Sequence, residues 1–231
     1  MRRRLQASAP AGAIVGTLRW RTLREEDWAE SWKQHYDIER VGRIVIRPAW
    51  REYEPREGEI VVALDPGMAF GTGQHATTRM CLAALQEVEV AGKRVLDLGA
   101  GSGILALAAF RLGAEYCLAL DIEEQAVSAA QANSSLNEAK DKIDIRLGSL
   151  EAATGEAQFD LVLANINAAA ITGLAVDLAA SLRAGGVLFA GGIIEERLSA
   201  PREALASAGF RIEGVMAEGD WRTIVARLPL P

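Results

Sequence analysis

The chain has 231 residues, of which 50% are hydrophobic and 24% are charged. This composition leaves ample apolar material to bury, so it excludes a disordered chain and predicts one large domain with room for a small appendage. Its apolar runs have the length of strands, far below the roughly 20 residues of a membrane-spanning helix. The two cysteines and two histidines are far apart and form no CxxC pattern, which leaves too few ligands for a typical zinc site. We therefore expect a cytoplasmic protein that has neither membrane contact nor a metal centre.

The formal net charge of −6 is unevenly distributed along the chain. Residues 1–24 contain six of the 25 basic residues and no acidic one, so 19 basic and 31 acidic residues remain, with a net charge of −12. An acidic body suits a basic macromolecular partner, or simply solubility, and argues against direct nucleic-acid binding. We interpret the arginine-rich start as a solvated tail or the remnant of a longer N-terminal region; a transit peptide or a basic arm is the alternative.

The first part of the chain, residues 1–64, is predicted to form a tail and a small strand and helix extension. Three short runs with alternating or β-branched residues predict strands, at 13–21, 42–50 and 59–64. Trp28 and Trp32 share one face of a helix predicted at 25–36, and we interpret them as core anchors rather than a binding surface. The larger domain is predicted to occupy residues 65–231.

From Arg94 onward, strand-like and helix-like runs alternate. The predicted strands are Arg94–Leu98, Tyr116–Asp121, Ile143–Leu147, Phe159–Asn165 and Gly186–Ala190. The predicted helices between and after them are Ile104–Leu112, Glu124–Asn137, Ala168–Arg183 and Glu195–Ala208. Apolar strands that alternate with helices indicate a parallel sheet covered on both faces.

The end of the chain breaks this alternation. The predicted strands Arg211–Ala217 and Trp221–Leu228 are joined by three residues, too few for a crossover helix, so they must form an antiparallel hairpin. The predicted fold class is therefore α/β, a doubly wound, mostly parallel, Rossmann-like sheet of seven strands with an antiparallel C-terminal hairpin. Many class I S-adenosylmethionine-dependent methyltransferases use this arrangement.

The sharpest local motif is the glycine-rich stretch VLDLGAGSGIL at Val95–Leu105. Gly99, Gly101 and Gly103 join a strand to a helix, so backbone can approach a ligand closely beside the positive end of the helix dipole. The dinucleotide fingerprint needs a third glycine where this chain has Ile104, which disfavours a nicotinamide oxidoreductase. A glycine-rich turn that only packs tightly is the alternative interpretation.

Polar side chains end two further strands of the predicted sheet. Asp121 lies 22 residues after Gly99, where a doubly wound fold places a ribose-binding carboxylate, and its alternative role is to cap the next helix. Asn165 ends another strand and is expected to meet substrate or cofactor, because the carboxyl ends of parallel strands face the ligand crevice. The turn at 148–150 is expected near an adenine.

The segment DPGMAFGTGQHATT at Asp65–Thr78 precedes a helix that we expect to begin at Thr77 or Thr78. It can be an ordinary glycine loop capped by one of these threonines, or a cover over the cofactor with flexible points at its glycines. His75 within it is a candidate proton acceptor, although its position favours a structural role.

With this segment, the sequence resembles the PrmA family, which methylates large-subunit ribosomal protein eleven. The resemblance rests on Asp65–Thr78, the glycine-rich loop and Asn165-Ile166, and on the Trp28/Trp32 helix, the PAW at Pro48–Trp50 and the EGDW at Glu218–Trp221. It implies the cofactor S-adenosyl-L-methionine and N-methylation of lysine and N-terminal amines of a basic ribosomal protein. It also implies cofactor contacts, which are Phe70, Thr77, Thr78, Gly99, Gly101, Asp121 and Asn165.

The resemblance leaves the substrate less secure than the reaction. The family carries an N-terminal substrate-recognition domain of several tens of residues, and little precedes Trp20 here, so we expect most of that domain to be lacking. The alternatives are a methyltransferase of the same build for another protein or a small molecule, and a non-catalytic cofactor-binding or ribosome-assembly module. In the catalytic reading, Asn165 orients the attacking amine and His75 is the candidate proton acceptor.

Overall fold

A computed structural model describes residues 36–65, 71–153 and 158–230. Residues 37–231 group into one compact unit, which carries all the elements discussed below. The predicted strand at 13–21, the predicted helix at 25–36 except for Tyr36, and Phe70 lie outside the described residues.

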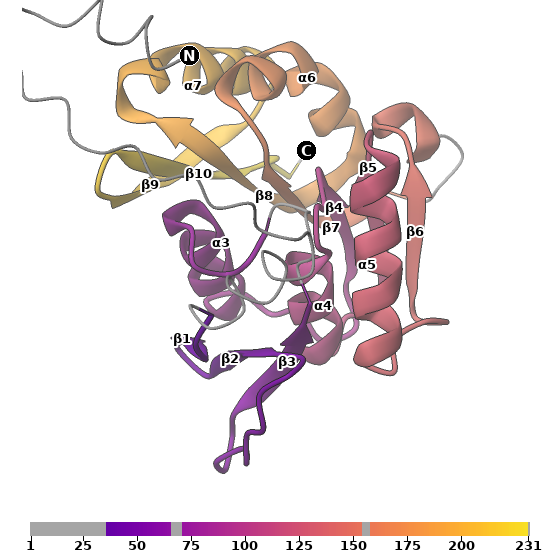
Figure 1. Ribbon diagram of the computed structural model, residues 1–231. Coiled ribbons are helices and arrows are strands. Elements are labelled where there is room, and N and C mark those ends of the chain that lie inside the picture. The colour runs from indigo at the N-terminus through magenta and orange to yellow at the C-terminus, as the bar shows by residue number, and fades with distance from the viewer. Residues whose placement is uncertain (1–35, 66–70, 154–157, 231) are drawn as a thin grey trace, which may run out of the picture. The chain divides into compact units, whose positions relative to one another are not determined.

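The centre of the fold is a seven-stranded sheet with the order β6-β5-β4-β7-β8-β10-β9 (Figure 1). Its strands are β4 (Arg94–Leu98), β5 (Tyr116–Asp121), β6 (Ile143–Leu147), β7 (Phe159–Asn165), β8 (Leu182–Ile194), β9 (Arg211–Glu218) and β10 (Trp221–Arg227). The pairs from β6 to β8 are parallel, and β10 is antiparallel to both β8 and β9. The predicted doubly wound sheet with an antiparallel terminal hairpin is confirmed.

Two apolar cores lie on the two faces of this sheet. The helices are α3 (Ala76–Gln86), α4 (Ile104–Arg111), α5 (Glu124–Leu136), α6 (Ala168–Ser181) and α7 (Ser199–Ser207). One core joins α3 and α4 to side chains such as Val95, and the other joins α6 and α7 to side chains such as Leu96. Successive strand residues thus bury opposite faces, which explains why the central strands β4, β5 and β7 are apolar at most positions. Figure 1 shows α6 and α7 on one side of the sheet and α3 and α4 on the other.

A second, three-stranded sheet covers α3 and α4. It consists of β1 (Glu39–Val41), β2 (Ile44–Pro48) and β3 (Ile60–Leu64), with β1 and β2 antiparallel and β2 and β3 parallel. Its buried side chains, such as Ile46 and Leu64, belong to the same core as α3 and α4. The predicted strand at 42–50 is confirmed as the shorter β2, whereas β1 was not predicted. Gly42, with φ of 58°, turns the chain between these two strands.

Other predicted boundaries shift where the chain packs differently from its local pattern. The predicted helix at 195–208 is a 3₁₀ turn, Glu195–Arg197, followed by α7, which accommodates Pro201 in its first turn. A further 3₁₀ turn, Leu150–Ala153, was not predicted. β8 extends well beyond the predicted Gly186–Ala190, since it pairs with β7 on one side and β10 on the other. Among the described residues, no helix is both long and apolar enough to cross a membrane.

Candidate active site

The candidate site lies at the carboxyl edge of β4, β5 and β7. Leu98, the last residue of β4, pairs with Leu120 on one side and Ala164 on the other. The residues that follow these three positions are Gly99, Asp121 and Asn165. The order of the strands reverses at β4, and doubly wound sheets bind ligands at such a reversal. The structure therefore brings these three predicted residues to one place.

The glycine-rich loop wraps over the end of β5. Gly99, Gly101 and Gly103 have φ of 74°, 54° and 80°, a region that side chains other than glycine rarely adopt. The Gly101 N–H donates to Asp121 Oδ2 at 2.8 Å, and the Glu123 N–H donates to Asp121 Oδ1 at 3.0 Å. Asp121 thus ties the loop to the end of β5 and is not the N-cap of α5, which is Glu123. Its predicted contact with a ribose remains a prediction.

Asp97 is a buried carboxyl group directly beneath this loop. Its side chain is 1% exposed, and Oδ2 accepts a hydrogen bond at 3.0 Å from the N–H of Ala106 in the first turn of α4. Oδ1 is also buried and has no hydrogen-bond partner among the described residues. Burial raises the pKa of Asp97 to about 7, since the Ala106 N–H compensates only in part and the Asp121 charge adds repulsion.

Helix α3 and its N-cap place His75 and two threonines beside the end of β7. It begins at Ala76 with His75 as N-cap, whose Nδ1 accepts from the Thr77 N–H at 3.4 Å and lies 2.8 Å from Thr77 Oγ1. The predicted cap at Thr77 or Thr78 is therefore wrong. Both threonine side chains turn inward instead and are 1% exposed, and Thr78 Oγ1 accepts from Asn165 Nδ2 at 3.4 Å.

A cavity of about 270 Å³ opens at this point. Its lining comes from four parts of the chain and consists of His75, Thr77, Asn165, Ile166, Asn167, Gly192 and Trp221. Asn165 Oδ1 is buried and has no hydrogen-bond partner among the described residues. Gly191, which pairs with Asn165, is the residue that leaves room, because a Cβ there would lie 2.8 Å from that oxygen.

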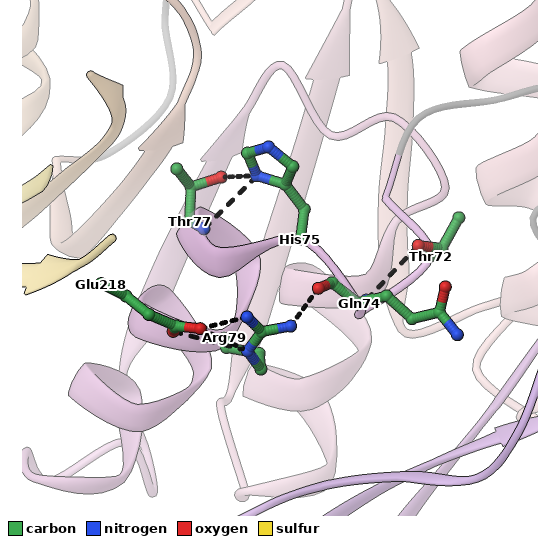
Figure 2. Close-up of polar contacts among 6 residues, drawn as sticks. All are labelled: Thr72, Gln74, His75, Thr77, Arg79 and Glu218. Carbon is green, nitrogen blue, oxygen red and sulfur yellow. Dashed lines mark hydrogen bonds and ion pairs between the residues drawn. The ribbon is translucent and has the colours of Figure 1, made fainter. Parts of the chain in front are cut away.

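The C-terminal hairpin supplies the wall of the cavity opposite Asn165. The Trp221 ring packs edge-on against His75 with centroids 4.6 Å apart and an interplanar angle of 70°. One turn into α3, Arg79 forms an ion pair with Glu218 and donates to the Gln74 carbonyl, so it joins the hairpin to the start of the helix (Figure 2). Two residues of the EGDW sequence thus contribute to the site: Glu218 pairs with Arg79 of α3, and Trp221 lines the cavity.

The surroundings of His75 favour its neutral form. Burial and the nearby Arg79 charge hold the pKa of His75 below its usual value, although Glu218 acts in the opposite direction. Nδ1 is engaged by Thr77, whose N–H and hydroxyl both lie within hydrogen-bond distance of it.

The variant His75→Asn separates the capping role from proton transfer. An asparagine oxygen can still accept from the Thr77 N–H, whereas His75→Ala removes the cap and should lower the free energy of unfolding by about 1 kcal/mol. We expect His75→Asn to retain both the stability and most of the methyl transfer of the unsubstituted protein. Denaturant unfolding and a methylation assay check this, and a folded His75→Asn protein without activity would assign His75 to proton transfer instead.

S-adenosylmethionine carries an ammonium group, a carboxylate, a ribose and a sulfonium, and the residues of the site suit these groups. Two buried acceptor oxygens without partners in the described structure, Asp97 Oδ1 and Asn165 Oδ1, suit a cationic group. Gly148, at the start of the turn expected near an adenine, donates its N–H to the Asp121 carbonyl at 2.8 Å, so that turn lies beside the same strand end. These acceptor oxygens and the position of the turn therefore fit the cofactor.

Several residues of the site were not singled out by the sequence pattern. Trp221 appeared only as part of the EGDW sequence, and Ile166 only beside Asn165. Gly192 and the buried Asp97 carried no distinct signal, apart from the spacing of an acid two residues before Gly99. In the described part of the chain, no three His, Cys, Asp or Glu side chains are grouped so that they could hold a metal ion.

Comparison with known proteins agrees with this site. The family model described as "Ribosomal protein L11 methyltransferase (PrmA)" matches residues 4–229. The ribosomal protein L11 methyltransferase of Symbiobacterium thermophilum is 46% identical over 217 residues, which cover 93% of this chain and 70% of the relative.

Two solved structures of methyltransferases are similar to this chain. The ribosomal protein L11 methylase of Lactobacillus delbrueckii subsp. bulgaricus is 34% identical with a TM-score of 0.78, covering 84% of this chain and all of that one. A T. thermophilus 16S rRNA methyltransferase, solved with AdoMet and guanosine, is 26% identical with a TM-score of 0.56 over 69% of this chain and 45% of its own. With nearly the whole chain matched by one family model, this protein belongs to the PrmA family of ribosomal protein L11 methyltransferases.

Proposed function

We propose that this protein transfers methyl groups from S-adenosylmethionine to lysine and N-terminal amines of ribosomal protein L11. The observation that carries the proposal is Asn165, which lines a cavity and whose buried Oδ1 has no hydrogen-bond partner among the described residues. Family membership supports the reaction and the cofactor. The complex of a related fold with AdoMet supports the same cofactor.

The bound cofactor supplies an electrophilic methyl group on a sulfonium, which the amine attacks in line. The protein's task is to hold the amine neutral and aligned, a contribution that can reach about 7–11 kcal/mol in well-oriented reactions. We assign Gly99, Gly101, Asp121, Thr77 and Thr78 to the cofactor, together with Phe70.

The amine is expected to enter the cavity between Asn165 and Trp221. A lysine amine, with a pKa of about 10.4, is mostly protonated at neutral pH, whereas an α-amine, at about 7.7–8.0, is less so. Removal of the amine from water in a small cavity favours its neutral form. Asn165 Oδ1 is then an acceptor for one amine N–H, which would direct the nitrogen lone pair away from the strand and toward the methyl group.

The partner is proposed to be a basic protein in the cytoplasm, without direct contact to nucleic acid. The net charge of −6, with the acidic excess outside residues 1–24, supports attraction to a basic surface. This attraction is long-range and should weaken with salt.

The experiment that tests the function is transfer of labelled methyl groups from S-adenosylmethionine to purified ribosomal protein L11, with cell extract in parallel. Label on L11 amines is the expected result. Label only on another protein or a small molecule would keep the chemistry and overturn the substrate. Cofactor binding without turnover on any amine would favour a non-catalytic module instead.

The variant Asn165→Ala is expected to lose methyl transfer by about 10²-fold or more, because it removes the acceptor that orients the amine. The matched control is Asn167→Ala, which lines the same cavity but whose side chain caps α6 by accepting from the Ala170 N–H at 2.9 Å. This control should cost about 1 kcal/mol of stability and little activity.

Calorimetric titration with S-adenosylhomocysteine shows which ligand Asn165 serves. We expect cofactor affinity to change much less than turnover in Asn165→Ala, since Thr78 and the loop remain. If affinity and turnover fall together, Asn165 is a cofactor ligand. If neither falls, the mechanism proposed for this residue is wrong.

A further inference from the structure

Helix α5 and its C-cap residue bury two asparagine side chains in a part of the fold that is otherwise packed with small or apolar groups. Asn133 is 0% exposed and Asn137 is 1% exposed. Buried amides are retained in a fold only when their donors and acceptors are satisfied. Their partners therefore identify what they hold in place.

Asn133 connects the end of β3 to the glycine-rich loop. Its Oδ1 accepts from the Asp65 N–H at 2.8 Å, and its Nδ2 donates to the Ser102 carbonyl at 2.9 Å. Ser102 lies between Gly101 and Gly103, two of the three glycines of the loop, and is itself 0% exposed. A single side chain thus fixes the backbone of both segments.

Ser102 extends this connection to a third segment. Its hydroxyl donates to the Gly71 carbonyl at 2.6 Å, in a contact so close that a Cβ at Gly71 would lie 2.7 Å from the hydroxyl oxygen. Gly71 also has φ of 103°, so glycine is required there for both reasons. One helical turn before Asn133, Ala130 packs against Gly103, where an added Cβ would lie 3.2 Å from the Ala130 Cβ.

We propose that Asn133 and Ser102 are positioning residues that preset the glycine-rich loop for the cofactor. They hold the loop against α5, Asp65 and Gly71, so that the loop keeps one conformation before any ligand arrives. Preorganisation of this kind increases affinity because less ordering is required on binding. The inference rests on the proposed cofactor site, and neither residue lines the cavity beside Asn165.

Asn137, the C-cap residue of α5, provides a matched control four residues after Asn133. Its Oδ1 accepts from the Ala63 N–H at 2.9 Å, and its Nδ2 donates to the Ala63 carbonyl at 2.6 Å and the Asn133 carbonyl at 2.8 Å. It has the same chemistry and burial as Asn133, and it too holds β3. The difference is that Asn133 also bonds the loop.

The experiment compares Asn133→Asp and Ser102→Ala with Asn137→Asp. Aspartate keeps the Oδ1 acceptor and replaces the Nδ2 donor by an oxygen. This oxygen faces the Ser102 carbonyl in Asn133→Asp, and the Ala63 and Asn133 carbonyls in Asn137→Asp. Both aspartate variants should lower the unfolding temperature to a similar extent. Titration with S-adenosylhomocysteine should then show affinity about tenfold or more weaker for Asn133→Asp and Ser102→Ala, and little changed for Asn137→Asp.

Amide hydrogen exchange without any ligand gives a second, independent measurement. The Gly101 N–H, which is bonded to Asp121, should exchange faster in Asn133→Asp and Ser102→Ala than in Asn137→Asp. If Asn133→Asp does not fold, Ser102→Ala carries the comparison alone.

The inference would be overturned if Asn133→Asp and Asn137→Asp changed the affinity and the Gly101 exchange rate equally. It would also be overturned if both quantities were unchanged in Ser102→Ala. Failure of the unsubstituted protein to bind S-adenosylhomocysteine would instead overturn the proposed function. The exchange comparison would still decide whether these two residues hold the loop.

Discussion

Replacing Gly192 by alanine is expected to reduce methyl transfer by about 10²-fold or more, because it displaces the residue next to Asn165. Gly192 has φ of 77°, and an added Cβ would lie 2.7 Å from the Ile166 carbonyl carbon and closer still to its oxygen. Ile166 cannot retreat freely, since its side chain occupies the space where a Cβ at Gly99 would be. The substitution should therefore disturb the amine cavity and the glycine-rich loop together.

The cost in stability should be on the order of 3 kcal/mol, from the unfavourable φ and the backbone overlap combined. Gly173→Ala is the control, because Gly173 lies within α6 and has nothing within 4 Å of an added Cβ. That variant should be slightly more stable than the unsubstituted protein. A Gly192→Ala protein with normal turnover and normal cofactor affinity would contradict the placement of the cavity at Gly192.

Asp97 is expected to make the protein less stable as the pH rises from about 4 to about 7. Its pKa is raised from 3.8 to about 7 in the folded protein, so in this interval the folded state holds a proton that the unfolded state has released. The free energy of unfolding then falls with pH, by up to about 1.4 kcal/mol per pH unit and on the order of 4 kcal/mol in all. Above pH 7 the carboxyl group is ionised in both states, and its contribution no longer changes.

Asp97→Asn removes this titration. The difference in unfolding free energy between the variant and the unsubstituted protein should grow in favour of the variant between pH 4 and pH 7 and then level off. Denaturant unfolding over this range measures the difference, and parallel curves would contradict the raised pKa. The variant should also bind S-adenosylmethionine more weakly, because the buried carboxylate that suits a cationic group has lost its charge.

The central strands of the large sheet could be predicted closely because their apolar runs are buried on both faces. β4, β5, β6 and β7 begin and end where the sequence predicts. Parallel strands align their carboxyl ends, so the proximity of Gly99, Asp121 and Asn165 also followed from the order of the elements. The hydrogen bond from the Gly101 N–H to Asp121 could not be predicted, because it depends on how the loop folds over β5.

By itself, the sequence determined the α/β class, the parallel core with its terminal hairpin, and the strand ends that carry the site, because hydrophobic periodicity and loop length are local properties. Only the tertiary structure decided that His75 caps α3, that Trp221 packs against it across the cavity, and that Asn133 joins three distant segments. These features are contacts between residues far apart in the chain. Their existence depends on packing geometry, for which the local sequence pattern contains no period or motif.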